Sequence, residues 1–102
     1  MDPRVRMVVT SYPTTGIENR FTAISYPEIK VKKSEYVTGW WNVYIEIRTD
    51  RNGKIARMDV LRPETDGAME KLFVEQVKKE ITRWSFDSIP AEIHVDVRFY
   101  VE

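Results

Sequence analysis

The sequence predicts a small α+β domain in which a mainly antiparallel sheet of three or more strands carries one main helix on one face. Three segments lead to this prediction. Residues 40–48 are rich in aromatic and β-branched side chains, which is typical of a strand. Residues 68–83 place apolar side chains at helical spacing, and residues 93–101 alternate between apolar and polar. The length of 102 residues fits one domain with one core.

A hairpin is expected at the start of this core. In residues 40–48 the apolar positions that should face the core are Trp41, Val43, Ile45 and Ile47. Asn52-Gly53 follows, and both residues tolerate positive φ, which favours a tight turn between antiparallel strands. Residues 54–62 would form the returning strand, whose imperfect alternation indicates a bulge. Pro63 ends this strand because proline cannot donate a ladder hydrogen bond.

The next segment is predicted to be a helix over residues 68–83, capped by Asp66 or Gly67. Steps of three and four residues join its apolar positions into one stripe that should pack on the sheet. Its charged side chains mostly occupy the opposite side and are interpreted as a solvated face. The apolar stripe consists of Met69, Leu72, Phe73, Val77, Ile81 and Trp84.

The last strand, residues 93–101, has one apolar and one polar face. Because the helix carries the chain back across the sheet, this strand should lie beside the first strand of the hairpin. The expected core is therefore ββαβ with strand order 2-1-3, and the last strand lies at an edge. An edge presents unpaired backbone groups, with which an N-terminal strand, a second copy of the chain or a partner peptide can pair.

Residues 1–25 are interpreted as an N-terminal extension that can supply extra strands over residues 4–10 and 20–26. Residues 26–102 are interpreted as the main domain. Residues 28–36 are ambiguous between a short helix and an irregular segment.

The composition argues against several classes of function. Lys and Arg together number 16, as do Asp and Glu, and this balance argues against a dedicated binder of duplex DNA. The absence of cysteine excludes disulfides and thiolate metal sites. No apolar run approaches the roughly 20 residues of a membrane-spanning helix, and no signal-peptide core is recognised in the first residues.

No residue pattern supports an enzyme, a metal site or a cofactor site. His94 is the sole histidine. It therefore lacks the partners that a metal site or general-base catalysis requires, and it is interpreted as structural. The polar sheet face gathers acids with interleaved arginines, which is typical of cross-strand ion pairs. No catalytic serine elbow, phosphate-binding glycine loop or zinc-protease motif occurs. We therefore expect a non-enzymatic protein without a cofactor.

The order and spacing of several features between Tyr26 and Val101 resemble the TonB C-terminal domain, whose outline TolA-like domains share. These features are Tyr26-Pro27, Gly39 before the first strand, the Asn52-Gly53 turn, the amphipathic helix, Arg83-Trp84-Ser85-Phe86 at its end, and the alternating Val95-Asp96-Val97-Arg98-Phe99. The chain departs from the family pattern in a longer gap between Tyr26-Pro27 and Gly39. Pro90 is also displaced from the helix-end Phe86.

The resemblance implies a periplasmic, non-enzymatic domain of an energy transducer that is anchored to the inner membrane in its full-length parent. Such a domain grips an extended peptide of an outer-membrane transporter or another envelope protein through its last strand. Several members of the family form homodimers by strand exchange. The residues that the resemblance implies for partner binding are Val95, Asp96, Val97, Arg98, Phe99, Tyr100 and Val101.

Two other functions stay open. Trp40, Tyr44 and Tyr100 share the polar face with Arg48, Arg57 and Arg98, and this combination could stack the bases of a single-stranded nucleic acid. Such binding requires that residues 1–25 leave the aromatic side chains uncovered. Alternatively, the domain is a structural scaffold module of a cell-envelope complex, which predicts stable self-association and no peptide binding.

Overall fold

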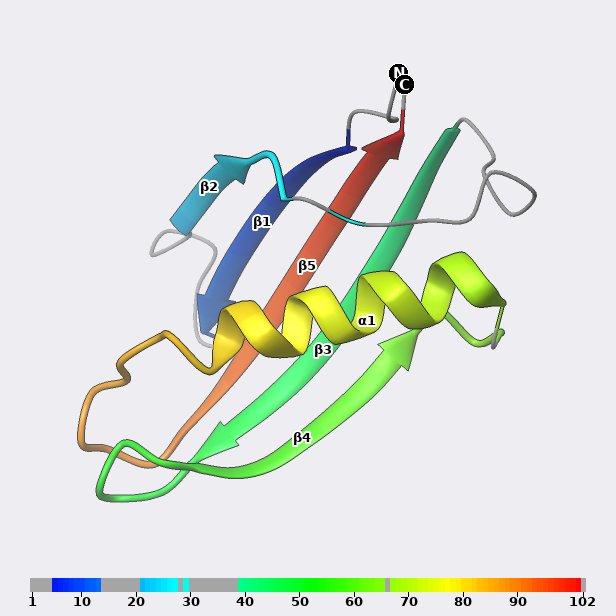
Figure 1. The fold of residues 1–102 in the computed structure, drawn as a ribbon. Helices are drawn as coiled ribbons and strands as arrows, with labels where there is room; N and C mark the ends of the chain where they lie inside the picture. The colour runs from blue at the N-terminus through cyan, green and yellow to red at the C-terminus, as the bar shows by residue number, and fades with distance from the viewer. Residues whose placement is uncertain (1–4, 14–20, 28, 30–38, 66, 102) are drawn as a thin grey trace.

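The computed structural model describes residues 5–13, 21–27, 29, 39–65 and 67–101, which form five strands and one helix. Figure 1 shows the helix crossing one face of a single twisted sheet. The elements are β1 (Val5–Pro13), β2 (Phe21–Ser25), β3 (Gly39–Thr49), β4 (Ile55–Arg62), α1 (Ala68–Ile81) and β5 (Ala91–Val101).

All strand pairings are antiparallel, and the strand order is β2-β1-β5-β3-β4. The predicted core with order 2-1-3 and the last strand at an edge is therefore wrong. β5 is the central strand of five, with β1 on one side and β3 on the other (Figure 1). The physical reason lies in β1, whose apolar residues Val5, Met7 and Val9 stand opposite apolar residues of β5 and complete the buried face.

Local structure follows the sequence closely where the pattern is strong. β3, β4, α1 and β5 begin and end within two residues of the predicted segments. β1 and β2 occupy the expected extra strands of the N-terminal extension, and both join the main sheet. Gly67 is the N-cap of α1, without a side-chain capping bond. Asp66 and nearly all of residues 28–36 lie outside the described residues.

The hairpin between β3 and β4 has the predicted turn. Gly53 adopts a φ of 75°, and the carboxylate of Asp50 accepts hydrogen bonds from the backbone N–H groups of Asn52 and Lys54 at 2.8 and 3.0 Å. These two bonds hold the pKa of Asp50 below its usual range. The register of β4 shifts twice, near Thr49 and near Tyr44 of β3, so the predicted bulge is confirmed and a second one accompanies it.

The core lies between α1 and the face of the sheet that α1 covers. Phe73 of α1 stacks on Phe99 of β5 with ring centroids 4.3 Å apart. Trp41 of β3 packs against the ring of Phe73 at a centroid distance of 5.4 Å. The predicted core position of Trp41 and Trp84 is confirmed, since both are partly buried against this cluster. The fully buried apolar residues are Val5, Met7, Val9, Val43, Ile45, Ile47, Met69, Phe73, Val77, Ile81, Val95, Val97, Phe99 and Val101.

Candidate binding face

The residues predicted to bind a partner lie in the middle of the sheet. Val95, Val97, Phe99 and Val101 are buried. Backbone partners flank the whole segment, because residues 95–101 pair with β1 on one side and with β3 on the other. Asp96, Arg98 and Tyr100 alternate with these buried residues and point to the opposite face. A peptide could therefore pair with the backbone of β5 only if β1 or β3 left the sheet.

The face opposite α1, called here the open face, is built from the polar register positions of the strands. Directly opposite residues in adjacent strands project to the same side of a sheet, so the register assigns the neighbours on this face. β1 and β2 extend the sheet edge to edge and do not lie over this face. The rows across β1, β5 and β3 are Arg6–Tyr100–Trp40, Val8–Arg98–Asn42, Thr10–Asp96–Tyr44 and Tyr12–His94–Glu46.

One end of the open face carries what we call the aromatic–arginine patch, formed by Arg6, Trp40, Arg98 and Tyr100. The guanidinium carbon of Arg6 lies 4.6 Å from the ring centroid of Tyr100, and that of Arg98 lies 5.8 Å from the ring of Trp40. Both distances allow a cation–π attraction. Trp40 is 61% exposed, which is unusual for so large an apolar side chain. The patch therefore offers aromatic surface to solvent beside two cations that are already held in place.

The other end of the open face has its arginines paired with acids. Arg57 lies 2.8 Å from Asp59, and Arg48 lies 3.7 Å from Glu92. Within the part of the chain that the structure describes, neither Arg6 nor Arg98 has a carboxylate partner. The Nε atom of Arg6 is also buried without a hydrogen-bond acceptor. The charges of Arg48 and Arg57 are therefore compensated by neighbouring acids, whereas, among the described residues, those of Arg6 and Arg98 are not.

Between these two ends, His94 is held by aromatic side chains. The ring of Tyr12 stacks on His94 with centroids 5.5 Å apart, and the hydroxyl of Tyr44 is hydrogen bonded to Nδ1 of His94. Burial, followed by a hydrogen bond to Tyr12, raises the pKa of Tyr44 to about 12. Asn42 donates to Asp96 Oδ1 at 2.5 Å and to the Val97 carbonyl at 3.1 Å. Tyr12 and Tyr44 thus fix the position of the His94 ring.

Two carboxyl groups on this face share a hydrogen bond. The bond to Glu92 raises the pKa of Glu46, and the same bond lowers the pKa of Glu92. The guanidinium of Arg48 also lies 3.7 Å from the carboxylate of Glu92. No group of three or more acidic or histidine side chains among the described residues is arranged to hold a metal ion.

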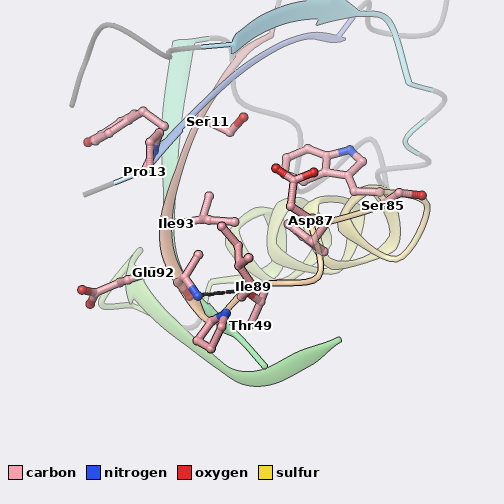
Figure 2. A pocket seen from close by; sticks show the side chains of 13 residues that line it. Ser11, Pro13, Thr49, Ser85, Asp87, Ile89, Glu92 and Ile93 are labelled. Atoms are coloured by element: carbon pink, nitrogen blue, oxygen red, sulfur yellow. Dashed lines mark hydrogen bonds between the residues drawn. The ribbon is translucent and has the colours of Figure 1, made fainter. Parts of the chain in front are cut away.

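A groove of about 900 Å³ lies on the α1 side of the sheet, between the end of β1, the start of β5 and the loop after α1 (Figure 2). Figure 2 shows Ser11, Ile93 and Asp87 on its walls, while the carboxylate of Glu92 points away from it. Thr49, which is 6% exposed, fixes the loop because its hydroxyl donates to the Ile89 carbonyl and accepts from the Ala91 N–H, each at 3.1 Å. The described lining of the groove includes two serines, Ser11 and Ser85, and no histidine, lysine or cysteine.

Arg6 is the member of the patch that sequence reasoning missed. The alternation of Val5, Met7 and Val9 with Arg6 and Val8 is the signal that could have placed it on the open face. That signal becomes useful only when β1 is known to pair with β5.

Comparison with protein-family models, with curated proteins and with solved structures returns no match. In the described part of the chain no helix is long and apolar enough to cross a bilayer.

Proposed function

We propose that this chain is a non-enzymatic protein-binding domain that uses the open face of its sheet. The observation that carries the proposal is the aromatic–arginine patch. In it, an exposed Trp40 and a partly buried Tyr100 lie beside two arginines without carboxylate partners among the described residues. Trp, Tyr and Arg are the residues that most often dominate the binding energy of protein interfaces. The rings of Trp and Tyr bury a large area while losing little conformational freedom.

The β4 edge of the sheet and the backbone of β5 are less suited to a partner strand. β4 is an edge strand, but it carries two register shifts and the exposed cations Arg57 and Arg62. Bulges and charges are common devices by which proteins prevent pairing at an edge. Backbone pairing at β5 would require the loss of β1 or β3, each of which supplies part of the buried core. These features favour a contact through side chains of the open face.

We extend the proposal to a TonB-type energy transducer of the periplasm, with an outer-membrane transporter or another envelope protein as the partner. This extension rests on the sequence resemblance of residues 26–101 alone. The aromatic–arginine patch does not depend on it, and the test below is the same for any protein partner.

Single-stranded nucleic acid is the second candidate ligand, because Trp40, Tyr44 and Tyr100 lie on one face with several arginines. Two of those arginines, Arg48 and Arg57, are neutralised by neighbouring carboxylates. A phosphate chain crossing this face would also approach Asp96 and the Glu46–Glu92 pair, which disfavours it electrostatically. A scaffold role predicts self-association, which analytical ultracentrifugation would detect.

The test is a selection with a phage-displayed library of random linear peptides. The library is selected on the wild-type protein and counter-selected on the Trp40→Thr variant, because threonine keeps a strand preference while the ring is removed. The Leu61→Thr variant is the matched control, since Leu61 is also an exposed apolar residue but lies on β4.

We expect peptides that bind the wild type and the Leu61→Thr variant but not the Trp40→Thr variant. Enrichment of no such peptide, together with tight and salt-sensitive binding of a thymidine oligonucleotide, would replace the protein-binding proposal with the nucleic-acid one.

A further inference from the structure

Each of the two arginines of the patch lies against an aromatic ring and, among the described residues, neither contacts a carboxylate. Arg6 rests on the ring of Tyr100, and Arg98 lies over the ring of Trp40. At the far end of the open face, by contrast, Arg48 and Arg57 are paired with carboxylates. An arginine stacked on a ring loses less conformational freedom when its fork later binds an oxygen anion. The patch is therefore pre-arranged for a negatively charged group.

The spacing of the two arginine positions on the sheet follows from the register. Arg6 stands opposite Tyr100, and Arg98 is two residues from Tyr100 on the same strand face, so the two arginines are diagonal neighbours. Diagonal neighbours on a sheet face are about 7–8 Å apart. In an extended peptide, side chains two residues apart lie on one face and are separated by about 7 Å. The arginine positions on the sheet are therefore spaced like alternate side chains of an extended peptide.

We propose that the aromatic–arginine patch recognises a short extended peptide with two acidic residues separated by one residue, beside an apolar or aromatic side chain that packs on Trp40. This inference rests on the proposed protein-binding function and names the chemistry of the partner. Each carboxylate would accept charge-assisted hydrogen bonds from one guanidinium. The patch spans β1, β5 and β3, a width of about 10 Å, which suits three or four extended residues.

A polynucleotide fits this surface less well than an acidic peptide. A short peptide can place its two charges on Arg6 and Arg98 and then leave the sheet. A phosphate chain carries a charge at every nucleotide, and the neighbouring row of the face presents Asp96 beside Tyr44. The carboxylate of Asp96 would repel the phosphate next to the one bound at the patch.

The experiment begins from the peptides selected for dependence on Trp40. One such peptide is synthesised in its selected form, with its acidic residues changed to amides, and with phosphoserine in place of the acids. Each form is titrated by calorimetry into the wild type and into the Arg98→Glu, Arg98→Lys and Arg51→Glu variants. Arg51 is exposed in the hairpin turn at the other end of β3, so its reversal changes net charge equally without touching the patch.

We expect the selected peptides to contain the acid–x–acid pattern, and the Arg98→Glu variant to bind the acidic form at least about tenfold more weakly than the wild type does. The Arg51→Glu variant should bind it as the wild type does. The Arg98→Lys variant should fall between them, because lysine keeps the charge but loses the fork. The amide form should bind weakly to all four proteins.

Three results would overturn the inference. Trp40-dependent peptides without acidic residues would refute the acidic chemistry while leaving the proposed protein binding intact. Equal weakening by Arg98→Glu and Arg51→Glu would show that only net charge matters. Tighter binding of the phosphoserine form or of a thymidine oligonucleotide than of the acidic form would assign the patch to phosphate. If no peptide depends on Trp40, the proposed function itself fails.

Discussion

Replacing Met7 with alanine should destabilise the domain by about 3 kcal/mol, because large-to-small substitutions of buried methionine cost about 2–5 kcal/mol. Met7 is 1% exposed, lies on the core face of β1 and stands opposite Phe99 of β5 and Ser25 of β2. The substitution removes three heavy atoms from a site enclosed by strands on both sides. In a domain of this size, each kcal/mol lowers Tm by about 4–8 °C, so we expect a decrease of about 12–24 °C.

Urea denaturation followed by tryptophan fluorescence measures this difference. The matched control is Ile24→Ala on the neighbouring strand β2, where the side chain is 62% exposed. An exposed substitution of this kind should change the free energy of unfolding by less than about 0.5 kcal/mol. If Met7→Ala destabilises the protein by less than about 1 kcal/mol, β1 does not belong to the core, and β5 would regain a free edge for a partner strand.

Three further predictions concern the turn, the loop and the open face. Thr49→Val should cost about 1–3 kcal/mol by removing the hydrogen bonds that the Thr49 hydroxyl makes with Ile89 and Ala91, and should speed hydrogen exchange at the Ala91 amide. Unchanged exchange would refute this role. Gly53→Ala should lower stability by at least about 1 kcal/mol, because φ is 75° and a Cβ would lie 2.6 Å from the Phe86 carbonyl; a neutral result would contradict that packing. The pKa of Tyr44 is raised from 10.0 to about 12, so its stabilising contribution should be complete below pH 10 and disappear as the pH rises towards 12. Ultraviolet titration should then show one late tyrosine that is missing in Tyr44→Phe, and a titration curve that this variant leaves unchanged would contradict the shift.

The elements of the fold can be read from local patterns in the sequence, because each pattern reports burial on one side of one element. The alternation of Trp41, Val43, Ile45 and Ile47 predicts a strand, and the Asn52-Gly53 pair predicts its hairpin. The helix stripe likewise predicts the residues that α1 buries against the sheet, among them Phe73.

The strand order cannot be obtained in the same way. The alternation of β5 indicates one buried face but says nothing about whether one or both of its backbone edges are paired. Val5, Met7 and Val9 form a short pattern that fits an isolated extra strand as well as a core strand. Only the matching of these three residues to the buried residues of β5 decides that β1 lies beside it.

The candidate site, likewise, can be predicted only in part from the sequence. Arg98, Tyr100 and Trp40 could be assigned to one polar face from the sequence, because each alternates with a core residue. The contribution of Arg6 depends on the pairing of β1 with β5, which links residues that are far apart in the chain. The absence of a carboxylate beside Arg6 and Arg98 among the described residues likewise depends on three-dimensional neighbours.

The most direct test of binding through the open face is an amide and indole chemical-shift titration of the isotope-labelled protein with a peptide selected on it. We expect the largest changes at the Trp40 indole N–H and at the amides of Arg98, Tyr100 and Arg6, with β4 unaffected. Changes concentrated in the backbone amides of β4, Ile55–Arg62, would show that the peptide adds a strand at the sheet edge and would contradict binding through the aromatic–arginine patch.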